Sequence, residues 1–183
     1  MTPSRWSDLE TLFSPNGAYS NCWCTWWILS GKEFSEARPS DRKSILEGLV
    51  AGGEKPGLLA YRGKEPVGWC AVGPRPRYTR MMSLRSQVYR PPDVTAGNWV
   101  INCFYIARTH RGSGVAAALL EAAVSFAAKA GATVIDGYPL LDGSQRAASL
   151  FVGTYSMFAG AGFVEVSRVR ERPLMRLELS GKG

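Results

Sequence analysis

The segment from Ile101 to Ala128 constrains the fold of this chain more than any other. Its pattern predicts an apolar strand, a short basic turn that contains two glycines, and then a long helix. The start of a helix offers backbone N–H groups without helical partners, and it is the positive end of the helix dipole. Glycines let a bulky anion approach that backbone closely. The segment therefore predicts a binding site for a phosphate-bearing ligand at the junction between strand and helix.

The residues of this junction follow the pattern R-G-x-G-x-A, formed by Arg111, Gly112, Gly114 and Ala116. The pattern resembles the acyl-CoA-binding signature of the GNAT N-acetyltransferase superfamily, Gln/Arg-x-x-Gly-x-Gly/Ala. Ile106 precedes Arg111 by five residues, where members usually carry an aliphatic residue at the end of the fourth strand. Further on, the segment Phe158–Val164 resembles the family's Tyr-x-x-x-Gly-Phe segment. The resemblance extends over residues 99–179.

The resemblance implies a single α/β domain over residues 1–183. The implied fold is a mixed, mostly antiparallel sheet of about six or seven strands with helices on both faces. The implied function is transfer of an acetyl group from acetyl-CoA, the co-substrate, directly to a primary amine. The acceptor would be a small molecule or a protein, and the chain leaves its identity open. The resemblance also implies that the fourth and fifth strands splay apart, so that the pantetheine arm enters the gap.

The family's cofactor contacts carry over to ten positions of this chain. These are Phe104, Tyr105, Ile106, Arg111, Gly112, Ser113, Gly114, Val115, Ala116 and Phe158. In the family, backbone N–H groups of the fourth strand polarise the thioester carbonyl, which here corresponds to Tyr105 and Ile106.

The catalytic groups are less clearly marked. The family's usual general acid is a tyrosine at the position of Phe158, which cannot donate a proton. Tyr155, almost one helical turn earlier, or Ser156 can take that role, although a structural role for Tyr155 fits equally. This departure also leaves open the alternative that the protein is a non-catalytic acyl-CoA-binding module. For the general base we select Asp136 at the end of a strand. Tyr138 and Asp142 are alternatives, whereas His110 is expected to contact cofactor or solvent.

A dinucleotide-binding fold is the main rival, because residues 112–117 also satisfy G-x-G-x-x-A and Asp136 follows at a suitable spacing for a ribose contact. Two observations disfavour it. Residues 108–111 separate the glycines from the strand, and the chain after Gly112 is too short for the rest of a doubly wound sheet.

The formal net charge is +7, and five arginines fall between Gly73 and Pro91: Arg75, Arg77, Arg80, Arg85 and Arg90. Such a segment can attract a polyanionic cofactor, bind nucleic acid or form a solvated loop. No nucleic-acid module is visible, so a nucleic-acid partner is not expected. The Cys22-x-Cys24 pair alone is insufficient for a metal site, and we predict no metal. Trp23, Trp26 and Trp27 can line an acceptor pocket or fill the core.

The remaining pattern predicts the order of elements. We expect helices over 6–13, from 39–41 onward, over 114–129 and over 150–160, and strands over 21–29, 57–61, 66–72, 99–107, 133–138, 163–170 and 174–179. We expect irregular structure in the arginine segment and a polar loop over 140–149. The start of the chain lacks a recognisable signal peptide, and no apolar run suits a membrane span. We therefore expect a cytoplasmic protein that does not bind membranes, with a homodimer left open.

Overall fold

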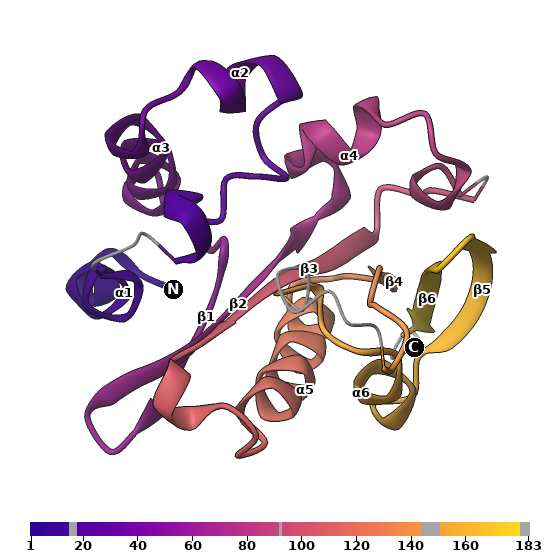
Figure 1. Ribbon diagram of the computed structural model, residues 1–183. Helices are drawn as coiled ribbons and strands as arrows, with labels where there is room; N and C mark the ends of the chain where they lie inside the picture. Colours follow the sequence, from indigo (N-terminus) through magenta and orange to yellow (C-terminus); the bar gives the residue numbers. More distant parts are fainter. Residues whose placement is uncertain (15–17, 92, 144–150, 180–183) are drawn as a thin grey trace.

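The computed structural model describes residues 1–14, 18–91, 93–143 and 151–179 (Figure 1). These residues form a six-stranded sheet in the order β1-β2-β3-β4-β6-β5. The strands are β1 Gly57–Arg62, β2 Glu65–Pro74, β3 Asn98–Ile106, β4 Val134–Gly137, β5 Val164–Val169 and β6 Arg172–Glu178. The α-helices are α1 Trp6–Phe13, α2 Gly31–Glu36, α3 Pro39–Ala51, α4 Thr79–Ser83, α5 Val115–Lys129 and α6 Tyr155–Gly160. Neighbouring strands are antiparallel except β3 and β4, which are parallel. This confirms the predicted fold class.

Helices cover both faces of the sheet (Figure 1). Side chains of β2 alternate between the two faces, as a strand buried on both sides requires. Cys70 packs in one cluster with Leu120 of α5, and Trp69 packs in the other with Phe13 of α1. The predicted helices 6–13 and 114–129 and both predicted hairpins are confirmed within a residue or two at their ends. No described helix combines the length and the hydropathy that crossing a bilayer requires.

The parallel strands β3 and β4 separate after a short ladder. Their register ends at the pair Ile101–Gly137, whereas β3 continues to pair with β2 as far as Ile106. The Ala107 N–H donates to the Val67 carbonyl on the β2 side at 2.9 Å. Because backbone groups alternate in an antiparallel ladder, Phe104 and Ile106 turn their N–H and C=O groups toward the opposite, open edge of β3. The splay that the family resemblance implies is therefore present.

Three expectations from the sequence were wrong or incomplete. The aromatic segment 21–29 is a series of turns, and positive φ angles at Asn21, Trp23 and Cys24 are incompatible with a strand. Helix α2, with its capping box at Ser30, was not expected. The predicted helix 150–160 begins only at Tyr155, after Thr154 caps it. Most of the predicted loop 140–149 lies outside the described residues.

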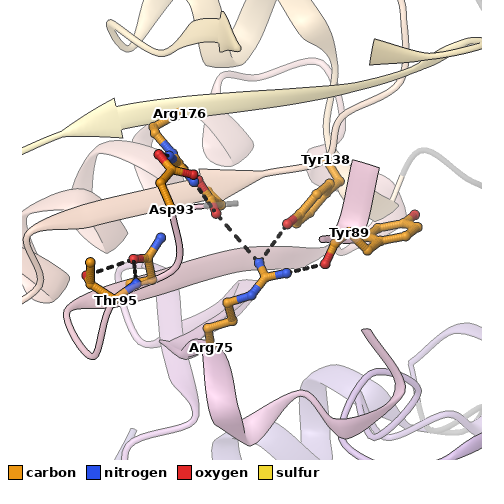
Figure 2. Close-up of polar contacts among 8 residues, drawn as sticks. Arg75, Tyr89, Asp93, Thr95, Tyr138 and Arg176 are labelled. Atoms are coloured by element: carbon orange, nitrogen blue, oxygen red, sulfur yellow. Dashed lines mark hydrogen bonds and ion pairs between the residues drawn. The ribbon is translucent and has the colours of Figure 1, made fainter. Parts of the chain in front are cut away.

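A buried ion-pair network ties the arginine-rich segment to the sheet (Figure 2). The Asp136 carboxylate on β4 accepts from Arg176 Nε at 2.8 Å and from Arg176 Nη2 at 3.1 Å, and it lies 3.6 Å from Arg75 Nη1. Arg75 also donates to the Tyr138 hydroxyl at 2.8 Å and to the Tyr89 carbonyl. The segment expected to be irregular instead forms short helical turns, among them α4, and its first arginine is buried in the core.

Candidate active site

A cavity of about 920 Å³ opens beside the free edge of β3. Its lining comes from residues 18–34 before and within α2, from the end of β3, from the turn into α5 and from residues 151–157, with Tyr89 and Arg172 completing it. Eight of the ten predicted cofactor residues line it: Phe104, Tyr105, Ile106, Arg111, Gly112, Gly114, Val115 and Ala116. The tertiary structure thus brings the strand edge and the glycine turn to one cavity.

The turn into α5 has the backbone that its glycines predict. Gly112 has a φ of 73° and Gly114 a φ of 80°, a left-handed conformation that a residue with a Cβ rarely adopts. Apart from the glycine and its two chain neighbours, no residue has an atom within 4 Å of the place where a Cβ would stand at either glycine, so both face open space. The Arg111 Nε donates to the Ile106 carbonyl at 3.3 Å, and Ser113 Oγ donates to the His110 carbonyl at 2.7 Å. The turn is therefore tied to the end of β3.

The N-terminus of α5 fits an anionic group. The first helical hydrogen bond runs from the Ala118 N–H to the Gly114 carbonyl, so the N–H groups of residues 115–117 lack helical acceptors. The first turn contains no acidic residue, and exposed Arg111 precedes it. Free N–H groups, the helix dipole and a nearby cation together favour phosphate oxygens. Ser113 does not line the cavity, because its hydroxyl turns back to His110.

The open edge of β3 differs in one detail from the prediction. The alternation set by the Ala107–Val67 hydrogen bond turns the Tyr105 N–H toward β2. The N–H groups at the open edge are those of Phe104 and Ile106. A carbonyl entering the gap would meet the N–H groups of Phe104 and Ile106, whereas Tyr105 contributes its side chain to the cavity wall.

Phe158 does not contact the cavity, contrary to its predicted role as a cofactor contact. Its side chain is fully buried, with edge-to-face contacts to Phe104 and Phe163 at centroid distances of 6.3 and 5.0 Å. The ring fills the space beside Gly137, where an added Cβ would come within 2.2 Å of it. The position that is a tyrosine in the family motif therefore serves here as core packing between α6 and the sheet.

The two predicted proton donors also lie away from the cavity lining. The Arg168 guanidinium of β5 stands 5.8 Å from the centre of the Tyr155 ring. The exposed Ser156 hydroxyl donates to Asp142 at 2.8 Å, and the same carboxylate accepts the Ser156 N–H at 3.0 Å. Tyr155 thus packs against β5, and Ser156 and Asp142 form a surface pair at the start of α6. The geometry gives no support to a catalytic role for any of them.

Asp136 is not positioned as a general base. It is fully buried, its oxygens bind two guanidinium groups, and it does not line the cavity. Tyr138, an alternative base, has its hydroxyl bound by Arg75, and burial raises its pKa. The sequence placed Asp136 at a strand end but carried no sign of its two partners, which lie far from it along the chain.

The cavity includes groups that sequence reasoning missed or left open. Trp26 and Trp27 line it, as one of the two sequence-based alternatives proposed. Tyr89 and Arg172 also line it, but no spacing pattern marked them. None of the five arginines between Gly73 and Pro91 does, so that segment reaches the cavity through Tyr89 alone. Three thiols, of Cys22, Cys24 and Cys103, border the cavity, with 3.4 Å between the last two sulfurs.

No group of three possible metal ligands occurs among the described residues.

Comparisons with known proteins agree with this fold. The family model of the acetyltransferase (GNAT) family matches residues 23–151. Among solved structures, the fold is similar to the ribosomal-protein-alanine N-acetyltransferase from Brucella melitensis, with 18% identity, coverage of 98% of this chain and 97% of that one, and a TM-score of 0.54.

Two further structures contain the cofactor. One is yncA, a putative acetyltransferase from Salmonella typhimurium with acetyl-CoA, at 16% identity, 97% and 92% coverage and a TM-score of 0.57. The other is the PaiA N-acetyltransferase from Thermoplasma acidophilum with coenzyme A, at 13% identity, 98% and 96% coverage and a TM-score of 0.55. No curated protein sequence matches the chain. Because the family model spans more than half of the residues and the fold agrees with it, the chain belongs to the GNAT family of acetyltransferases.

Proposed function

We propose that the protein is an acetyl-CoA-dependent N-acetyltransferase that transfers the acetyl group directly to a primary amine. One observation carries the proposal: a single cavity joins the open edge of β3 to the glycine turn at the start of α5. The turn supplies donors for phosphate oxygens, and the edge supplies N–H groups for a carbonyl. Acyl transfer requires both within the length of one ligand.

The residues of the cavity divide the chemical work. Acetyl-CoA supplies a thioester, whose carbonyl carbon an amine can attack. The Ile106 N–H at the open edge is the donor for the carbonyl oxygen, where negative charge develops. Tyr89 and Thr154 are hydroxyl groups of the lining that can protonate the departing sulfur. No carboxylate lines the cavity among the described residues, so the amine proton passes to water.

Gly114→Val tests the cofactor site. Valine at a φ of 80° strains the turn and displaces its N–H groups, so we expect coenzyme A affinity to fall at least about tenfold, or 1.4 kcal/mol. Gly63→Val is the matched control, because Gly63 also has a positive φ and open surroundings but lies in the β1–β2 turn. Calorimetric titration with coenzyme A measures both. Equal affinities of the two folded variants would contradict the assignment.

Turnover is tested separately. The wild-type protein with acetyl-CoA and a panel of primary amines should release coenzyme A and form an N-acetyl product detectable by mass spectrometry. Tight binding of coenzyme A without any product across the panel would favour the alternative, a non-catalytic acyl-CoA-binding module. Phe158 in place of the family's tyrosine is the observation that keeps this alternative in view.

A further inference from the structure

Aromatic side chains outside the predicted cofactor positions form a wall of the cavity. Trp26 contacts Phe34 with ring centres 4.8 Å apart, and Trp27 contacts Tyr89 at 5.6 Å. All four rings line the cavity. They come from the segment around α2 and from η4 Gln87–Tyr89, away in sequence from the turn that binds phosphate. We call these four residues the aromatic wall.

The guanidinium groups around the aromatic wall lack carboxylate partners. The carbon at the centre of the Arg80 guanidinium stands 3.8 Å from the Trp26 ring centre, and that of Arg42 stands 3.9 Å from the Phe34 ring centre. Arg172 lines the cavity and donates to the Tyr138 carbonyl at 3.2 Å. Their hydrogen bonds go to neutral carbonyl groups, and the Nε atoms of Arg42 and Arg80 are buried without a partner.

Among the described arginines that are at least partly buried, this absence of carboxylate partners is confined to one place. Six described arginines are at least partly buried, and Arg75, Arg77 and Arg176 among them each pair with an aspartate or glutamate. The other three are Arg42, Arg80 and Arg172, all at the aromatic wall. No described Asp or Glu lines the cavity, and the sequence outside the described ranges contains neither residue. No described carboxylate therefore neutralises the positive charge here, and two of the three guanidinium groups contact only the Trp26 and Phe34 rings and backbone carbonyl groups.

A cation entering this region would be repelled by three guanidinium groups, whereas an anion would be attracted. Arg172 alone of the three lines the cavity, so it can meet a ligand directly. Burial raises the pKa of the Tyr89 hydroxyl, and the positive charge of Arg172 partly offsets this increase. Rings of the wall offer a stacking surface, and a guanidinium binds a carboxylate through two parallel hydrogen bonds.

We propose that the acceptor is a small primary amine that carries both an aromatic ring and a carboxylate, with Arg172 binding the carboxylate and the aromatic wall binding the ring. The inference rests on the proposed function in calling the ligand an acceptor, but the predicted binding of the ligand does not depend on turnover. It disfavours polyamines and other cationic acceptors, since these bring no anion to Arg172.

Three indole compounds separate the contribution of ligand charge to binding from that of the aromatic ring. Indole-3-propionate is an anion without an amine, tryptamine is a cation, and tryptophan carries both groups. Calorimetric titration into the full-length protein saturated with coenzyme A should give at least about tenfold tighter binding of indole-3-propionate and tryptophan than of tryptamine. Arg172→Met should remove this preference and leave coenzyme A affinity unchanged.

Two further variants control for charge and folding. Arg85→Met removes one positive charge from an exposed site outside the cavity and should keep the preference. Arg172→Lys retains the charge and should keep part of it, and thermal unfolding checks that each variant is folded. Equal binding of the three compounds, or an Arg172→Met variant that loses coenzyme A affinity instead, would overturn the inference.

Turnover distinguishes this inference from the proposed function. Acetylation of tryptamine in preference to tryptophan overturns the inference and supports the acetyltransferase. Binding of indole-3-propionate that depends on Arg172, with no acetyl transfer to any amine, supports the anion site and counts against the acetyltransferase.

Discussion

Replacing Asp136 with asparagine should unfold the protein at a markedly lower temperature. The carboxylate is fully buried and lies within 3.6 Å of both Arg75 and Arg176, whose side chains are each 5% exposed. The asparagine side chain would keep the volume but lose the charge. Arg75 would lose its counter-ion, and Arg176 would keep only the exposed Asp93. Removing one partner of a buried ion pair costs about 3–5 kcal/mol. For a domain of this size, that corresponds to a decrease in Tm of about 6–20 °C.

Urea and thermal unfolding of wild type and Asp136→Asn measure this difference. Glu165→Gln is the matched control, because it breaks the ion pair with Arg168, in which the arginine and glutamate side chains are 39% and 24% exposed. Partly exposed pairs contribute about 0–1 kcal/mol, so this variant should unfold near the wild-type temperature. Similar losses in both variants would refute the reasoning. A stable Asp136→Asn variant whose kcat falls about 10²-fold would restore Asp136 as the general base.

Three other outcomes follow from the geometry. Tyr155→Phe should leave kcat, measured by coenzyme A release, close to the wild-type value, because the ring packs against Arg168. Removal of a general acid would instead lower kcat roughly 10²-fold. Phe158→Tyr should lower the free energy of unfolding in urea by about 1–3 kcal/mol, since its hydroxyl would enter a fully buried site without a partner. Contact with Cys24 and burial raise the pKa of the Cys22 thiol, so it should react with a disulfide reagent at pH 8 far more slowly in the folded protein than after denaturation.

Features that depend on neighbouring residues could be predicted from the sequence. The turn at Arg111–Ala116 needs only its own glycines and the helix that follows, and both are local. The hairpins and the long helix follow from hydrophobic periodicity and turn residues in the same way. The family motif extends over this same stretch, which is why the fold agrees with expectation and eight of the predicted cofactor positions lie at one cavity.

The tertiary structure alone decided what the remaining side chains do. The pattern at 21–29 suits a strand, yet its aromatic rings pack into different parts of the molecule. A series of turns in the backbone allows this. The sequence indicated that the Asp136 carboxylate is free, because its partners Arg75 and Arg176 lie 61 and 40 positions away along the chain. Helical spacing placed Tyr155 near Phe158 but could not determine that it packs toward β5. Sequence patterns report the period of each segment, whereas charge pairing and cavity lining depend on which distant segments pack together.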